Sequence, residues 1–481
     1  MEKSNKMRLW HYIGYACGEL SYTIENTFIA SYMVMYFTTA IGISALTVGT
    51  MTLICRIIDA FTDIGFGMIA DRTKKNRYGK FKPWYMGSLI PTAVAFVFVF
   101  AVPNSIGTGS AMAVLFMYIM YILFGSIFAT VNFQWLSAQT IVCTDNPKEK
   151  RTMTTWRQWA AAAAGVIISY MGVNLILHFN GTTAMMGRRG YMITAIIVAA
   201  LCLALAVFSC IMSKERATLG MWGQLDAANK EAAPMMQKLS LKEEFKVLKG
   251  NKLLWGALII NVFVFMMATT ATTLTSYYYT YTIGTPAMIA TVMTTGCILG
   301  TIVNTIVAPF LSQKLGRNAL YFISGGAMII AWFITWCSHG NITVLIVAWT
   351  IFQSFIQLFN AIIFRSIPDA VDWAEWKYGV SAPGIVASFV SFAQKIGMGV
   401  ATFIVTAALT LVGYQEGVAV QTDPTRLGIY YLYPCMPVIY ILLTLIGFAL
   451  INSIKKNELI QMRKDLNAKK GLEFDEKNAI V

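Results

Sequence analysis

Three ionisable residues lie within one apolar segment of the N-terminal region. The stretch Cys-Arg-Ile-Ile-Asp-Ala-Phe-Thr-Asp places Arg56, Asp59 and Asp63 three and four residues apart, which stacks them on one face of a helix. Two carboxylates one turn apart repel each other unless a cation or a proton lies between them, and the Thr62 hydroxyl can add a further oxygen ligand. The pattern predicts a small-cation site. The alternative is an internal ion pair between Arg56 and Asp59 that only orients helices.

Other apolar segments also carry polar residues, and each such residue is costly in a membrane unless it has a function or a partner. Glu19, Asn132, Arg157 and Lys395 are of this kind. Lys395 lies too deep in its apolar run to reach the membrane surface, so we expect it to face one of the two aspartates above. Arg157 stands at the start of a segment and has the alternative of extending to the surface.

Aromatic residues make up 13% of the chain, and most of them are expected in packing and in interfacial belts. Trp135 can stack on the apolar face of a sugar, with packing between helices as the alternative. The run from Tyr277 to Tyr281 is expected to form an interfacial belt or an outer gate.

The elements that position these residues follow from composition. Of the 481 residues, 57% are hydrophobic and only 12% are charged, too few charges for the surface of a soluble protein of this size. Apolar runs of about 20 residues are long enough to cross a membrane, and inside lipid they must be helices. Twelve such runs occur, at roughly 12–38, 43–69, 84–103, 110–137, 157–178, 190–212, 253–281, 287–312, 319–338, 342–364, 383–413 and 428–453.

The net charge of +14 reports orientation rather than a nucleic-acid partner. Lys and Arg gather in every second connection, most densely in 71–82. By the positive-inside rule, both termini are expected in the cytoplasm and the protein in the cell membrane. The eight cysteines and three histidines are scattered and show no zinc or redox spacing.

The twelve spans divide into two six-helix halves. We expect an N-terminal half at 1–212, a central cytoplasmic loop at 213–252, a C-terminal half at 253–454 and a cytoplasmic tail at 455–481. The fold class is thus an all-α membrane protein, and parallel six-helix halves are the architecture of the major facilitator fold.

Two motifs carry a resemblance to a known family. The first is Arg56-Ile-Ile-Asp59-Ala-Phe-Thr-Asp63 with Gly67-x3-Asp71-Arg72-Thr73, and the second, about 300 residues later, is Asp369-Ala-Val-Asp372-Trp-Ala-Glu375-Trp. With them, the chain resembles the glycoside–pentoside–hexuronide:cation symporters of the major facilitator superfamily over nearly its whole length.

The resemblance implies roles for individual residues. Asp59 and Asp63 match paired carboxylates that bind the coupling Na⁺, Li⁺ or H⁺, and Thr62 stands where a side chain influences cation choice. Arg157 and Lys395 match basic residues that face the sugar and cation cavity. The residues that match the charges of a cytoplasmic gate are Asp71, Arg72, Asp369, Asp372 and Glu375.

The chain also departs from the family pattern. Two aspartates that bind sugar hydroxyls in the family fall at Thr23 and Asn132, so the solute site has fewer carboxylates. Such a site suits either an anionic solute, for example a hexuronide, or another glycoside. Glu19 and Glu25, from the first span, are candidates to compensate. Further departures, at Ile64, Ser381 and Pro383, affect the surroundings of the cation pair and of the gate.

The expected function is symport of a glycoside, pentoside or hexuronide with Na⁺ or H⁺ by alternating access, in a monomer that carries no cofactor and is not an enzyme. One alternative is proton-coupled efflux of a metabolite or drug by the same fold. Another is a sensor that binds a sugar without transporting it.

Overall fold

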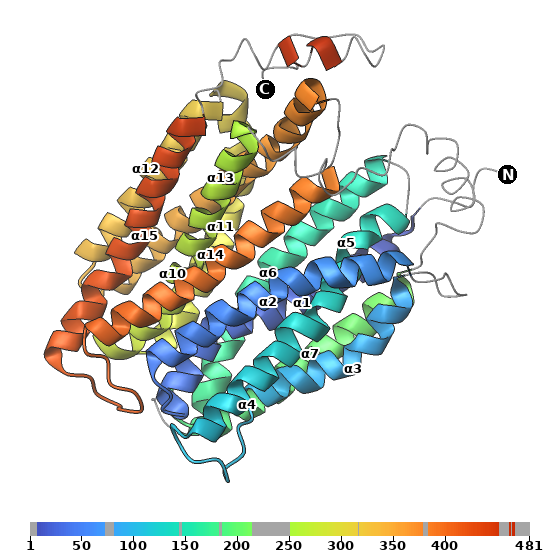
Figure 1. Cartoon of the computed structure of the whole chain (residues 1–481). Helices are drawn as coiled ribbons and strands as arrows, with labels where there is room; N and C mark the ends of the chain where they lie inside the picture. The colour runs from blue at the N-terminus through green and yellow to red at the C-terminus, as the bar shows by residue number, and fades with distance from the viewer. Residues whose placement is uncertain are drawn as a thin grey trace. The chain divides into compact units, whose positions relative to one another are not determined.

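The computed structural model describes residues 7–72, 81–143, 147–181, 185–213, 251–315, 317–378, 383–451, 461–462 and 464–466. Every regular element in these ranges is a helix, and none of them is a strand (Figure 1). Spans 1, 2 and 3 are α1 (Leu9–Met35) with its continuation η1 (Tyr36–Ala40), α2 (Ala45–Arg72) and α3 (Lys82–Val99). Span 4 consists of three consecutive elements, α4 (Ala111–Ile122), η2 (Leu123–Ala129) and α5 (Thr130–Val142). Spans 5 and 6 are α6 (Pro147–Asn180) and α7 (Arg188–Met212).

The second six spans repeat this arrangement of long helices. They are α10 (Lys252–Tyr277) continued by η4 (Tyr278–Ile283), α11 (Ala287–Lys314), α12 (Arg317–Cys337), α13 (Ile342–Tyr378), α14 (Pro383–Leu411) and α15 (Asp423–Ile451). The prediction of twelve helical spans is confirmed. Ten of the spans are long and apolar enough to cross a membrane by hydropathy alone. The other two are α1, which contains Glu19 and Glu25, and α3, which begins at Lys82.

The first span of each half ends in the same way. The α-helix gives way to a π-helix, η1 in span 1 and η4 in span 7, in which the hydrogen bonds reach one residue further along the chain. Gly42, with φ 74°, follows η1, and Gly284, with φ 78°, follows η4. A left-handed φ favours glycine, which has no Cβ to clash. This shared detail supports a duplicated half.

One compact unit of the chain comprises residues 1–235, 272–294 and 402–430. Within it α1 packs against α6 and α7, and α3 packs against α7. The unit also takes in η4 with the neighbouring helix ends and the connection between α14 and α15, so α10, α11, α14 and α15 each contribute to both units.

A hydrogen-bonded cluster joins residues of 272–294 and 402–430 to the N-terminal spans of the same unit. The Tyr277 hydroxyl lies 2.8 Å from Thr38 Oγ1, and the hydroxyls of Tyr281 and Tyr414 lie 3.2 Å apart. Glu416 Oε1 accepts a 2.9 Å hydrogen bond from the first backbone N–H of α2, where the positive end of the helix dipole favours an anion. We call these five residues the outer seal, because the sequence predicts that this end of the helices is extracellular.

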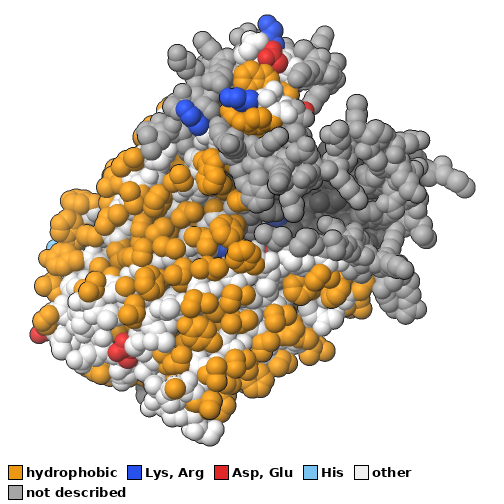
Figure 2. All heavy atoms as spheres, viewed as in Figure 1, with side chains coloured by type: hydrophobic (Ala, Val, Ile, Leu, Met, Phe, Trp, Pro, Cys, Tyr) orange, Lys and Arg blue, Asp and Glu red, His pale blue; other side chains and the backbone are white. Residues whose placement is uncertain are grey.

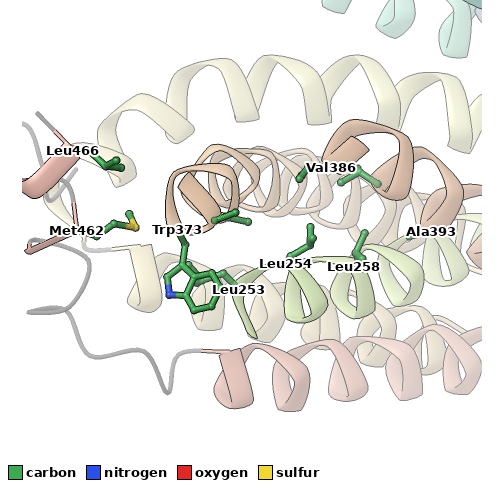
Figure 3. Packing of buried hydrophobic residues seen from close by; sticks show 11 residues of the cluster. Leu253, Leu254, Leu258, Trp373, Val386, Ala393, Met462 and Leu466 are labelled. Atoms are coloured by element: carbon green, nitrogen blue, oxygen red, sulfur yellow. The ribbon is translucent and has the colours of Figure 1, made fainter. Parts of the chain in front are cut away.

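The other compact unit comprises residues 236–271, 295–401 and 431–481. A segment of the predicted C-terminal tail packs onto its core, because Met462 and Leu466 are buried near Trp373 (Figure 3). The indole N–H of Trp376 donates a 2.9 Å hydrogen bond to Asp465. The other buried members of this cluster are Leu253, Leu254, Leu258, Ala370, Ala374, Val386, Val390 and Ala393.

The surface agrees with residence in lipid. Figure 2 shows hydrophobic side chains over most of the described surface on the face that it draws, with few charged groups among them. Of the predicted central loop at 213–252, only Ser213 and residues 251–252 are described. The division into halves at 1–212 and 253–454 stays a prediction.

Close helix packing at Gly397 gives a first prediction. A Cβ at this position of α14 would lie 2.5 Å from the carbonyl oxygen of Val262 in α10. Overpacking of this kind costs about 1–3 kcal/mol, so we expect Gly397→Ala to lower the Tm of the detergent-purified protein. Gly326→Ala is the matched control, because nothing lies within 4 Å of its Cβ. Equal Tm values for the two variants would contradict the close approach of α14 to α10.

Candidate cation and solute site

The acidic residues of α2 face span 4. Asp59 is almost fully buried, with 1% of its surface exposed, and its Oδ2 atom lies 3.3 Å from Nη1 of Arg56. Its Oδ1 atom accepts a hydrogen bond from the hydroxyl of Ser126 in η2. Asp63 is half-buried, and its Oδ1 atom accepts a 3.1 Å hydrogen bond from Thr130. The prediction that both carboxylates share one helix face agrees with these contacts, and the ion pair of the alternative interpretation is also present.

A local change of helix type accompanies these contacts. Span 4 is π-helical from Leu123 to Ala129, between the α-helical segments α4 and α5. Such π-segments frequently occur at functional sites. Thr130 also donates to the carbonyl of Gly125, five residues earlier. Gly125 lies beside Asp59, and a Cβ added to it would be in ordinary van der Waals contact with Oδ1, at 3.5 Å.

Ser126 and Thr130 were not among the residues predicted from the sequence. The available signal was weak, because it consists of two hydroxyls four residues apart in the run Phe-Gly-Ser-Ile-Phe-Ala-Thr. Thr62, which was predicted, is half-buried, and its hydroxyl donates a 3.1 Å hydrogen bond to the backbone carbonyl of Asp59. In this arrangement Ser126 and Thr130 hydrogen-bond to the carboxylates, and Thr62 hydrogen-bonds to the backbone.

Two predicted solute contacts form an ion pair with each other. Nε of Arg157 in α6 lies 3.0 Å from Oε2 of Glu19 in α1. The Glu19 side chain is 8% exposed and that of Arg157 is 32% exposed, so part of the guanidinium remains accessible. Thr23 follows Glu19 by one turn of α1 and is half-buried.

The other predicted contacts on span 4 engage α3. Asn132 accepts a 2.6 Å hydrogen bond from Ser88 and donates one of 3.1 Å to Thr92. The ring of Trp135 stacks on Tyr85 with centroids 5.8 Å apart, and only 1% of its surface is exposed. Both side chains therefore take part in helix packing, and their contact with a solute stays a prediction.

The remaining predicted residues lie in less fully described surroundings. Lys395 is half-buried in α14 and belongs to the second compact unit, so its pairing with an aspartate of α2 stays a prediction. Of the predicted gate residues, Asp372 and Glu375 are half-buried near the end of α13. Asp71, Arg72 and Asp369 stand on helical backbone, but their side chains lie outside the described part of the chain.

Comparison with known proteins gives the family. Residues 14–453 match the family described as MFS/sugar transport protein. The chain is 27% identical over 402 residues to the isoprimeverose transporter of Lactiplantibacillus pentosus, covering 83% of this chain and 80% of that protein. It is 24% identical to a putative 2,3-dihydroxypropane-1-sulfonate exporter of Escherichia coli (strain K12), covering 95% of each chain.

A solved structure shares the fold. The crystal structure of a D-xylose–proton symporter aligns with a TM-score of 0.59 at 13% identity, covering 90% of this chain and 96% of that one. Together with the twelve spans, these findings establish a multi-pass membrane protein with the major facilitator fold. The chain belongs to the MFS/sugar transport protein family, in agreement with its resemblance to the glycoside–pentoside–hexuronide symporters, and it is a solute transporter rather than an enzyme.

Proposed function

We propose that this transporter couples the uptake of a glycoside, pentoside or hexuronide to the entry of one monovalent cation, Na⁺ or H⁺. The observation that carries the proposal is the pair Asp59 and Asp63, buried or half-buried in α2 beside Arg56. The family resemblance gives these two positions the coupling role.

Charge balance favours a single monovalent ion. Arg56 is always protonated at physiological pH, so with both aspartates ionised the three side chains carry one net negative charge. Isolated charge is costly inside a membrane, and one Na⁺ or one proton neutralises it. Carboxylate and hydroxyl oxygens are hard ligands of the type that alkali and alkaline-earth cations prefer. The groups in place are Asp59, Asp63, Ser126 and Thr130.

Alternating access supplies the rest of the mechanism. The residues of the outer seal are hydrogen-bonded in this structure, and we take this arrangement as the closed outer side of the transport cycle. In our proposal, the outer seal opens to admit cation and solute and then closes over them. The predicted cytoplasmic gate opens afterwards and releases both. A neutralised α2 site stabilises the arrangement that binds solute, so cation and solute favour the same state.

Efflux is the second candidate, and the sequence similarity to a putative exporter favours it. The direction of transport separates the two proposals. An inward cation gradient drives a solute into vesicles by symport, whereas antiport with the same gradient drives it out. Membrane vesicles with an imposed Na⁺ or H⁺ gradient and radiolabelled glycosides therefore decide between them.

The coupling role predicts the effect of two substitutions. Asp59→Asn and Asp63→Asn each remove the net negative charge permanently, so solute binding no longer needs a cation. We expect gradient-driven accumulation to fall at least tenfold in both variants, while downhill exchange of solute continues. Asp423→Asn is the control, since Asp423 pairs with Arg426 at the surface and is 96% exposed. Normal accumulation by both α2 variants would contradict the assignment.

The Glu19–Arg157 pair predicts a second result. Removing one partner leaves the other charge buried without its counterion, which is costly. We therefore expect the losses of stability in Glu19→Gln and Arg157→Met, when added together, to exceed the loss in the double variant. The difference, which is the coupling energy of the pair, should be about 0.5–3 kcal/mol. Thermal unfolding (Tm) of the three variants measures it.

Uptake by the double variant then separates packing from solute binding. If Arg157 contacts the solute, the double variant recovers stability but retains a raised KM for uptake. A normal KM in the stable double variant would show that the pair only holds α1 against α6.

A further inference from the structure

The second half contains a polar cluster that the proposed function does not use. Gln353 and Gln357 of α13 face Cys297, Thr301 and Asn304 of α11. Gln353 Nε2 lies 2.9 Å from Cys297 Sγ, Gln357 Nε2 lies 3.2 Å from Thr301 Oγ1, and Asn304 Nδ2 lies 3.2 Å from Gln357 Oε1. We call these five residues the amide cluster. All of them belong to the second compact unit.

The cluster lies near the middle of its helices. Cys297 and Gln353 stand ten and eleven positions after the first residues of α11 and α13. At about 1.5 Å per residue, the cluster extends from roughly 15 Å at Cys297 to roughly 26 Å at Asn304 across a hydrocarbon core of about 30 Å, so Cys297 and Gln353 lie at the midplane. Transporters of this fold bind their solute near that depth. Amides are expensive there unless their hydrogen bonds are satisfied, so their presence calls for an explanation.

The repeat relates this cluster to the candidate cation site. Helices α2 and α11 are the second spans of their halves, and α4 and α13 begin the fourth spans. Asp59 and Thr301 each stand fourteen positions after the first residue of their helix. Ser126 and Gln357 each stand fifteen positions after the first residue of their span. The hydrogen-bonded pair Thr301–Gln357 thus occupies the repeat position of Asp59–Ser126.

The internal hydrogen bonds leave acceptors unused. Asn304 Oδ1 and Asn360 Oδ1, the latter also on α13, have no hydrogen-bond partner among the described residues. Polar side chains between membrane helices often serve as interhelical glue, and this explains the bonds within the cluster. Those bonds leave these two acceptors without a donor among the described residues, and a solute hydroxyl is a group that can supply one. Four members of the cluster are half-buried, so each keeps part of its surface accessible: Thr301, Asn304, Gln353 and Gln357.

The chemistry of the cluster indicates the class of ligand. Its groups are uncharged, and an amide both donates and accepts, as a sugar hydroxyl does. A uronate or a sulfonate would need a cation, and none of the cluster's residues is one. Of the two basic residues predicted to face the solute cavity, Arg157 is already paired with Glu19, and Lys395 is expected to face an aspartate of α2. Resting on the proposed symport, we infer that the amide cluster binds hydroxyl groups of the solute and that the solute is an uncharged glycoside.

Substitution tests whether the cluster binds solute. In reconstituted vesicles with a cation gradient, Gln357→Met and Asn304→Leu keep side-chain size but remove the amides. We expect kcat/KM for a neutral probe, isoprimeverose or methyl β-xylopyranoside, to fall at least tenfold, with Tm within a few degrees of wild type. Thr305→Val is the control, because among the described residues the Thr305 hydroxyl bonds only to the carbonyl of Thr301 in its own helix. A large loss of Tm with an unchanged KM in both variants would show that the cluster is structural and overturn the inference.

Competition in the wild-type protein tests the ligand class without any substitution. We expect the neutral probes to be accumulated, and methyl β-glucuronide to compete at least tenfold more weakly. Cation-driven accumulation of the glucuronide in preference to the neutral probes would overturn the inference and leave the proposed symport standing. Absence of cation-driven accumulation of either class would instead overturn the symport, and the inference with it.

Discussion

The burial of the Asp59 carboxylate inside a membrane helix is the constraint on which the rest of this structure depends. An ionised carboxylate at that depth is tolerated only with a counterion and hydrogen-bond donors. Arg56 supplies the charge from the same helix, and Ser126 supplies a hydroxyl from the neighbouring span. Asp63, one turn further along, adds a second carboxyl group to this site. In our proposal a monovalent cation balances the charge of the site, and this dependence on a cation couples it to transport.

Meeting this constraint shapes the helices around it. Span 4 becomes π-helical at Leu123–Ala129, and in this region Ser126 and Thr130 both reach the carboxylates of α2. The repeat position in the second half needs no counterion, because Thr301 and Gln357 stand there. The two halves therefore have the same architecture but different chemistry, with charge in the first and amides in the second.

The fold was predictable from the sequence because runs of apolar residues mark the spans, ten of them by hydropathy alone, and because lipid excludes other backbone structures. The cation pair was predictable as well, since spacing within one helix places Asp59 and Asp63 on the same face. Contacts between helices were not predictable. The partnership of Glu19 with Arg157 joins residues 138 positions apart, and the π-helical segment of span 4 leaves no periodic signal in the sequence.

The same limit explains the solute contacts. Asn132 and Trp135 are polar or aromatic residues in a span that lines the site, yet their side chains engage Ser88, Thr92 and Tyr85 of α3. Composition indicates that such residues are present but not which neighbour they face. Hydroxyls such as those of Ser126 and Thr130 are common in membrane helices, where they bond to their own backbone, so they did not stand out.

The central claim is that cation and solute bind to the same state through the Asp59–Asp63 site. Linkage requires each ligand to tighten binding of the other by an equal factor. The most direct measurement is a titration of the purified transporter with a glycoside that it is found to accumulate, at zero and saturating Na⁺ or at two pH values, and with the cation at zero and saturating sugar. The account predicts two equal factors in the wild-type protein and factors near one in Asp63→Asn. A sugar affinity that does not respond to either cation in the wild-type protein would contradict it.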